Sequence, residues 1–208
     1  MFSVSHNNSA FQASWAIALA ADSPVLVVPW QDDAGHVTYV DLRRQPERVL
    51  EIPEAHHQPA LARALQQLNA ADSPWATAKC DCWRLDEEDL EAVAFDLELA
   101  RDARFGQAGI GSYIDVYSRD ALCFVSLAQH RELLLRLTRT AMRPAGHTGH
   151  PVALLEFTLR RCIAEGEDGY AITVFLYAIG QDRVDAQANW DAALDALTVM
   201  LRSEGCVG

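Results

Sequence analysis

The run from Tyr170 to Ile179 constrains the fold more than any other part of this chain. It is built from aromatic, β-branched and small residues, and it contains no charged side chain. A strand that lacks a polar face is usually central in its sheet and covered on both sides. We therefore expect this run to form a central β-strand.

The sequence on either side of this run predicts a partner strand and a covering helix. Apolar and polar residues alternate from Leu155 to Arg161, which is typical of a half-buried strand. A charged turn with two glycines, residues 165–169, separates the two strands. Asp182 is placed to cap a helix, and apolar residues then recur at three- and four-residue steps up to Leu201. This helix is predicted to pack against the sheet.

Two strands followed by a helix are predicted three times, over residues 25–70, 112–143 and 152–203. Further strands and helices are expected over the following ranges: strands at 11–19, 25–28, 37–42, 77–85, 112–118 and 122–127; helices at 59–69, at 86–97 and after Ser126. Strands joined by short turns favour antiparallel pairing, with the helices to one side. The predicted fold class is α+β: a mainly antiparallel sheet with about four helices packed on one side.

The length of the chain allows one large domain or two small ones. We predict a single domain over residues 1–208, with a subdivision into two lobes near residues 100–111 as the alternative. From Leu90 onward the predicted order is helix, two strands, helix, two strands, helix. This order of elements is similar to that of acidic secretion-chaperone folds, although no sequence motif accompanies the resemblance.

Charge, cysteine content and hydropathy limit the classes of partner. A formal net charge of −12 disfavours nucleic acid. No apolar run approaches the roughly 18 residues of a membrane span, and no early positive charge marks a secretory signal. Five cysteines, an odd number, indicate reduced thiols. Together these features predict a cytoplasmic protein with neither a nucleic-acid nor a membrane partner.

A first candidate site lies on the strand predicted over residues 112–118. Tyr113, Asp115 and Tyr117 fall on one face of that strand, where an acid between two phenols is suited to a polar cleft. The solvent side of an edge strand is the alternative interpretation. Lys79 is the only lysine among 17 basic residues, which indicates either the codon bias of a GC-rich bacterial genome or an amine retained for a task. We include Lys79 in this candidate ligand site.

A second candidate site would bind zinc. Cys80 and Cys82 are two residues apart on a predicted strand and so face the same way, and His147 and His150 follow in a loop. Two thiolates and two imidazoles satisfy tetrahedral zinc, but the cysteine spacing is not that of a zinc knuckle. Small side chains packed in a strand, with histidines at the surface, are the alternative.

A third candidate site is a row of arginines. Arg136, Arg139 and Arg143 share one face of the helix predicted after Ser126. This face is suited to an anion or an acidic partner, whereas a solvated outer face is the simpler interpretation.

No group of catalytic residues stands out, and no cofactor is predicted. The first functional hypothesis is therefore a non-enzymatic protein that binds another protein or itself, with a homodimer as the commonest assembly. The second hypothesis is an enzyme or ligand-binding protein with its site at Tyr113, Asp115 and Tyr117. The third is a structural zinc protein.

Overall fold

The structure, a computed structural model, describes residues 11–30, 39–97, 108–143 and 153–205. Within those residues it contains six strands and, counting one 3₁₀ helix, seven helices. In chain order the elements are β1 (Gln12–Ala18), β2 (Leu26–Val28), η1 (Pro46–Glu51), α1 (Pro53–His57), α2 (Pro59–Leu68), β3 (Trp75–Arg84), α3 (Glu87–Asp96), β4 (Ala108–Ser118), α4 (Ala121–Phe124), α5 (Leu127–Ala141), β5 (Ala153–Ala164), β6 (Glu167–Gly180) and α6 (Arg183–Ser203).

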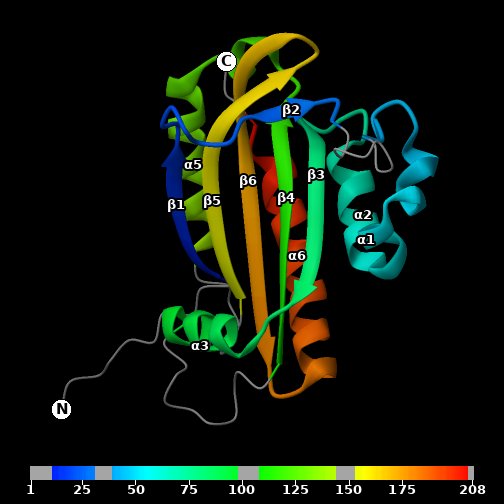
Figure 1. Ribbon diagram of the computed structural model, residues 1–208, viewed down its shortest axis with the longest axis vertical. Coiled ribbons are helices and arrows are strands. Elements are labelled where there is room, and N and C mark those ends of the chain that lie inside the picture. The colour runs from blue at the N-terminus through cyan, green and yellow to red at the C-terminus, as the bar shows by residue number, and fades with distance from the viewer. Residues whose placement is uncertain (1–10, 31–38, 98–107, 144–152, 206–208) are drawn as a thin grey trace, which may run out of the picture.

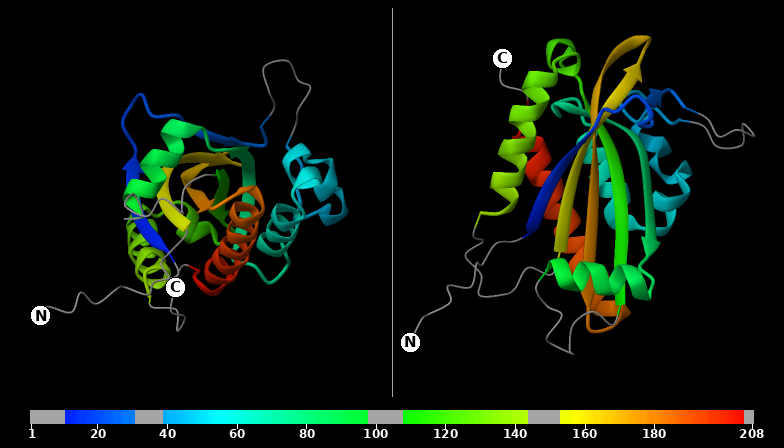
Figure 2. Two further views of the ribbon diagram at one scale, coloured as in Figure 1. Left: turned by 90° about the horizontal axis from the view of Figure 1, so that it is seen from below. Right: turned by 60° about the vertical axis from the view of Figure 1, so that its left-hand side comes forward.

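The strands form one curved sheet in the order β1-β5-β6-β4-β3, with the short strand β2 pairing with β5 beyond the end of β1 (Figures 1 and 2). Three neighbouring pairs, β5-β6, β6-β4 and β4-β3, are antiparallel. The pairings of β1 and β2 with β5 are parallel. The sheet is therefore mixed.

The carboxyl-terminal part of the chain confirms the prediction of a strand, a turn, a strand and a helix. The uncharged run lies in β6, between β5 and β4, and so is central in the sheet. Asp182 caps α6 by accepting hydrogen bonds from the backbone N–H groups of Val184 and Asp185. A Cβ at Gly180 would lie 2.3 Å from the backbone nitrogen of Ala186. Glycine therefore allows the helix to begin directly against the end of the strand.

One face of the sheet carries the main apolar core. Helices α2, α5 and α6 lie behind this face in Figure 1. Trp190 of α6 is fully buried there, and its indole Nε1–H donates to Ser112 Oγ of β4 at 2.9 Å. Alternate residues of β5, Leu155, Phe157 and Leu159, are also fully buried on this side. Burial on this face supplies most of the apolar packing of the described residues.

The described residues cover the opposite face at its two ends. At one end α3 packs through Val93 on a small apolar cluster with Ile179 (Figure 1). At the other end β2 and Phe124 of α4 pack against Tyr117 and Cys162. The middle of this face lies between the two clusters, and it holds Asp115, Arg160 and Thr173. We call this side the open face and the helix-covered side the covered face.

Several predictions of secondary structure are confirmed and others are wrong. The α+β class is confirmed, but the sheet is mixed, and the described residues contain seven helices and not about four. One of them, α3, lies on the open face instead of joining the other helices. Residues 122–127 form no strand, because Asp120 caps the short helix α4 and Ser126 caps α5 immediately afterwards. Residues 39–42, the described part of the strand predicted at 37–42, do not form a strand either.

These differences remove the resemblance in element order to the secretion-chaperone folds. A single strand, β4, stands between α3 and the next helix, where the resemblance requires two. Of the three strand-strand-helix units, only the one over residues 152–203 is formed as predicted. The predicted lobe boundary near residues 100–111 falls mostly outside the described residues.

Candidate functional site

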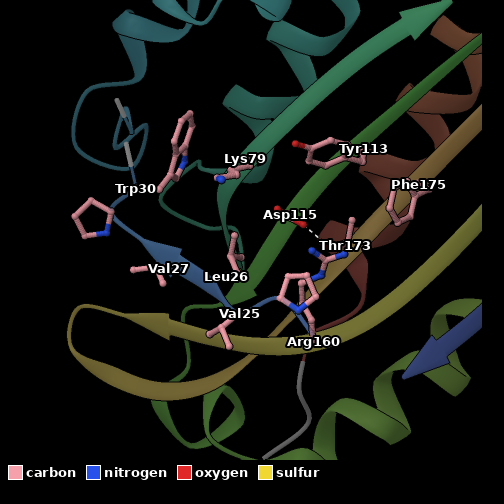
Figure 3. Close-up of a pocket in the computed structure, with 12 residues that line it drawn as sticks. Val25, Leu26, Val27, Trp30, Lys79, Tyr113, Asp115, Arg160, Thr173 and Phe175 are labelled. Atoms are coloured by element: carbon pink, nitrogen blue, oxygen red, sulfur yellow. Dashed lines mark hydrogen bonds between the residues drawn. The ribbon is translucent and has the colours of Figure 1, made fainter. Parts of the chain in front are cut away.

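A cavity of about 640 Å³ opens in the middle of the open face. It lies between the strand surface and the segment that carries β2, which crosses in front of the sheet (Figure 3). Its volume falls within the range of small-molecule sites, about 300–1,000 Å³. The described residues that line it are Pro24, Val25, Leu26, Val27, Pro29, Trp30, Lys79, Tyr113, Asp115, Arg160, Thr173 and Phe175.

Asp115 lies at the centre of the cavity floor. It pairs in register with Thr173 of β6, and the Thr173 hydroxyl donates a short hydrogen bond to Asp115 Oδ1. The residue is only 2% exposed. Burial raises the pKa of this carboxyl, while the hydrogen bond from Thr173 and the charges of Arg160 and Lys79 act in the opposite direction. The protein therefore keeps a desolvated acid at the base of the cavity.

Lys79 reaches the cavity from β3. It falls in the irregularity of the β3-β4 ladder between Thr77 and Cys80, opposite the part of β4 that holds Asp115. Its Nζ lies 4.7 Å from the centre of the Trp30 ring, a cation–π contact. Trp30 is itself fixed, because its Nε1–H donates to the backbone oxygen of Ala78 at 2.8 Å. Within the described residues, the ammonium group is thus positioned by an aromatic ring and not by a carboxylate.

Arg160 projects from β5 into the other side of the cavity (Figure 3). Its Nε is buried and has no hydrogen-bond partner in the part of the chain that the structure describes. A guanidinium group carries five N–H donors and no acceptor, so it requires an oxygen-bearing partner when it is buried. Among the described lining residues, Arg160 therefore has a buried donor that a ligand oxygen could satisfy.

The remaining walls are apolar and aromatic. Val25 and Val27 project from the β2 segment and are 37% and 47% exposed, respectively. Tyr113 and Phe175 form the opposite wall, with ring centroids 5.9 Å apart, and burial raises the pKa of Tyr113 to about 12. A ligand in this cavity would meet apolar surfaces at its sides and charged groups at its base.

The structure brings together three of the four residues of the first candidate site. Tyr113, Asp115 and Lys79 line the same cavity. Tyr117 shares their face, as the alternation predicts, but it is 4% exposed and packs against Phe124. It therefore lies in the apolar cluster beside the cavity and lines a separate hollow with Arg43.

The predicted zinc ligands are only partly described. Cys80 and Cys82 do share a face of β3, but it is the covered face. Burial raises the pKa of the Cys82 thiol to about 11 and that of Cys80 still further. His147 and His150 lie outside the described residues, and within the described residues no group of three or more potential ligands could hold a metal ion.

The cysteines also correct the prediction of uniformly reduced thiols. Cys80, Cys82 and Cys162 are free, whereas Cys123 is disulfide-bonded. Cys123 was predicted to lie in a strand, but it lies in α4.

The three arginines of the third candidate site have different surroundings in the structure. The Arg136 guanidinium bonds to Glu204 Oε2 at 3.2 Å and to the backbone oxygen of Gly205 at 2.6 Å. It therefore joins α5 to the end of α6. Arg139 and Arg143 are exposed.

Sequence reasoning missed Arg160, Thr173, Phe175 and Trp30 as members of the site. Arg160 was recognisable as part of the polar face of an alternating strand, but not as a neighbour of Asp115. That contact depends on the order β5-β6-β4, which places β6 between two strands distant in the sequence. Trp30 is added by the β2 segment, whose parallel pairing with β5 has no local sequence signal.

Comparison with known proteins gives no family for this chain: no family model, no curated protein and no solved structure matches it. Among the helices of the described residues, none combines the length and hydrophobicity of a membrane span.

Proposed function

We propose that this protein is a non-enzymatic binding protein for a small organic anion, which occupies the cavity on the open face. The observation that carries the proposal is the buried Nε of Arg160, which has no hydrogen-bond partner among the described residues, at the wall of a cavity of about 640 Å³. The ligand would have an acidic group for Arg160 and Lys79 and an apolar body for the walls.

The energetics of Arg160 support an anion. A buried donor without a partner costs about 1–3 kcal/mol, and more when the group is charged. A carboxylate, sulfonate or phosphate can accept two parallel hydrogen bonds from one guanidinium, which removes this cost. With Asp115 ionised, Lys79 and Arg160 give the described lining residues a net charge of +1, so an anion also complements their electrostatics.

The lining favours binding over catalysis. It includes Thr173 and Asp115, but none of the described lining residues is a cysteine, serine or histidine. Covalent catalysis generally needs a nucleophile with a base in hydrogen-bond reach. A preformed hollow with apolar walls and a few charged groups is the usual form of a binding site.

The proposal can be tested with anilinonaphthalene sulfonate, a fluorescent aromatic anion, and with N-phenylnaphthylamine, its uncharged analogue. The Arg160→Gln variant should weaken binding of the sulfonate by about tenfold or more, because a charge-assisted hydrogen bond is lost. Binding of the uncharged analogue should change little. Fluorescence titration measures both dissociation constants.

Arg161→Gln is the matched control, since Arg161 is the next residue of β5 and is exposed. It should bind both probes as the unmodified protein does. Equal affinity of the Arg160→Gln variant and the unmodified protein for the sulfonate would contradict the proposal. Urea unfolding of each variant identifies any loss of binding that comes from loss of the fold.

A second candidate function is self-association, and strand β1 favours it. β1 ends the sheet, contains no charged residue, and leaves Trp15 and Ile17 38% and 37% exposed. Edge strands of monomeric proteins usually carry charges or prolines that prevent pairing with another chain. A second copy of this chain could extend the sheet by pairing with β1.

Light scattering coupled to size exclusion tests this candidate. The unmodified protein should be a dimer, and Ala16→Lys, which places a charge in the exposed middle of β1, should be a monomer. A monomer at high concentration in both cases would exclude self-association. A cytoplasmic location in a bacterial cell remains a prediction from the sequence.

A further inference from the structure

Asp115 is an unexpected residue in a cavity suited to an anion. Its carboxyl is almost fully buried, and only Oδ1 has a hydrogen-bond partner within the described residues, the Thr173 hydroxyl. Lys79 and Arg160 line the same cavity on either side of it (Figure 3), and their charges act against the raised pKa of the carboxyl, although within the described residues neither side chain is hydrogen-bonded to it. Three charges thus share one hollow.

The surroundings of Asp115 contain few other groups that titrate. From β3 it is faced by Lys79, and from β5 by Arg160, while β6 supplies Thr173 and Phe175, which carry no charge. Segment 24–30 has no charged residue. Within the described residues, the other titratable groups of the open face on the adjoining strands are Asp81, Tyr113, Tyr117, Glu156, Cys162 and Tyr177.

We infer that the cavity takes up an organic monoanion together with one proton, and that Asp115 holds this proton while the ligand is bound. The inference rests on the proposed function and names the charge class of its ligand. A ligand anion in the same desolvated hollow would repel an ionised carboxylate. Protonation of Asp115 by solvent removes this repulsion and leaves both cations for the ligand.

The geometry also gives the protonated acid a role. A neutral carboxyl group has one O–H donor, which the ionised group lacks. Asp115 Oδ1 already accepts from Thr173, so the proton belongs on Oδ2, which has no described partner. A protonated Oδ2 can donate to an oxygen of the ligand. Burial already raises the pKa of this carboxyl, so its protonation near the bound anion costs less than that of an exposed aspartate.

Proton uptake makes the affinity depend on pH in a defined direction. Affinity should fall as the pH rises through the interval between the Asp115 pKa of the free protein and that of the complex. For each unit by which the bound anion raises this pKa, the affinity at high pH is lower by about tenfold.

Anilinonaphthalene sulfonate is a suitable probe, because its sulfonate stays ionised throughout the accessible pH range. Any proton taken up on binding therefore enters the protein and not the probe. Titration calorimetry at one pH in two buffers of different ionisation enthalpy counts that proton. Fluorescence titrations from about pH 5 to about pH 8 measure the affinity across the interval in which a raised aspartate titrates.

Three variants locate the proton. Asp115→Asn should bind the sulfonate more tightly than the unmodified protein at the upper end of this range, with no proton uptake and little dependence on pH. Glu156→Gln removes the other carboxyl of the open face whose pKa burial raises, and it should keep the uptake. Asp168→Asn, a change at an exposed position of β6, should also keep it.

The outcomes separate this inference from the proposed function. Sulfonate binding without proton uptake would overturn the inference and leave the proposed function standing. Uptake that persists in Asp115→Asn, or that disappears in Glu156→Gln, would overturn the assignment to Asp115. If the unmodified protein does not bind the sulfonate, both are overturned.

Discussion

The two faces of the central sheet are built from the same strands and serve different purposes. In β5, Leu155, Phe157 and Leu159 pack against the helices of the covered face, while Glu156 and Arg160 lie on the open face. The covered face is apolar almost throughout, and its few polar groups, such as Ser112, are hydrogen-bonded. In its middle the open face keeps a desolvated acid, Asp115, and an arginine, Arg160, whose buried Nε has no hydrogen-bond partner among the described residues.

This difference shows how one sheet can hold both a core and a site. Successive side chains of a strand point to opposite faces. Each strand can therefore carry apolar residues for the core at alternate positions and polar residues for the candidate site at the positions between them. The buried acid of the described residues, Asp115, lies on the open face, and their buried histidine, His130, lies on the covered side. The predictions below test this division, in order of decreasing expected effect.

The largest contrast is expected between two phenylalanines. Phe157 is fully buried on the covered face, and Phe157→Ala should lower the free energy of unfolding by about 3–5 kcal/mol. Phe175 lies half-buried at the cavity wall, and Phe175→Ala should cost less than half as much. Urea unfolding measures both, and equal losses would mean that the open face is also a packed core.

A smaller loss is expected when the covered face loses a polar partner. Ser112→Ala leaves the buried Nε1–H of Trp190 without its acceptor, which should cost about 1–3 kcal/mol. Ser14→Ala on the exposed strand β1 is the control and should change stability by no more than about 0.5 kcal/mol. A cost for Ser112→Ala as small as that of the control would show that polar groups of the covered face do not need pairing.

On the open face, loss of a charged group should increase the stability of the protein. Asp115→Asn should stabilise the unliganded protein by roughly 1 kcal/mol near neutral pH, because a buried carboxylate is replaced by a neutral amide. The folded protein holds the Asp115 proton more readily than the unfolded chain does, so this carboxyl lowers stability at high pH. The penalty should disappear as the pH falls towards about 4, and the variant should lack this dependence in urea titrations.

The covered side should show the reverse dependence on pH, through His130. Its Nδ1–H donates to the backbone oxygen of Ser126 at 3.0 Å, its Nε2 is buried without a described partner, and burial lowers its pKa. The folded protein therefore binds this proton less readily than the unfolded chain, and stability should fall as the pH drops below about 6.5. His130→Gln should remove this dependence, whereas His57→Gln at an exposed position should retain it.

Much of the fold was predictable where local signals agree. Asp86, Ser126 and Asp182 were recognisable as helix caps, and each accepts a hydrogen bond from the backbone as expected. The strand at 122–127 was wrongly predicted from its apolar residues. Asp120 and Ser126 instead cap two helical segments, because each side chain accepts a hydrogen bond from a backbone N–H group at the start of a helix. In a strand, these N–H groups would need a partner on a neighbouring strand.

The candidate site was predictable only in part, from one strand. Asp115 and Tyr113 share a face of β4 because of the period of two, which the sequence shows directly. The contact of Asp115 with Thr173, and its proximity to Arg160, follow from strand pairing. No local pattern encodes that pairing.

The sequence by itself determined which residues form the central strand, where its covering helix begins, and which side chains of each strand share a face. These properties depend on propensity, capping and periodicity, which act over a few residues. Only the tertiary structure decided that β1 and β2 run parallel to β5, and that Lys79, Asp115 and Arg160 meet in one cavity. Contacts between distant segments are selected by the burial of the whole sheet, and that free energy is a property of the assembled fold.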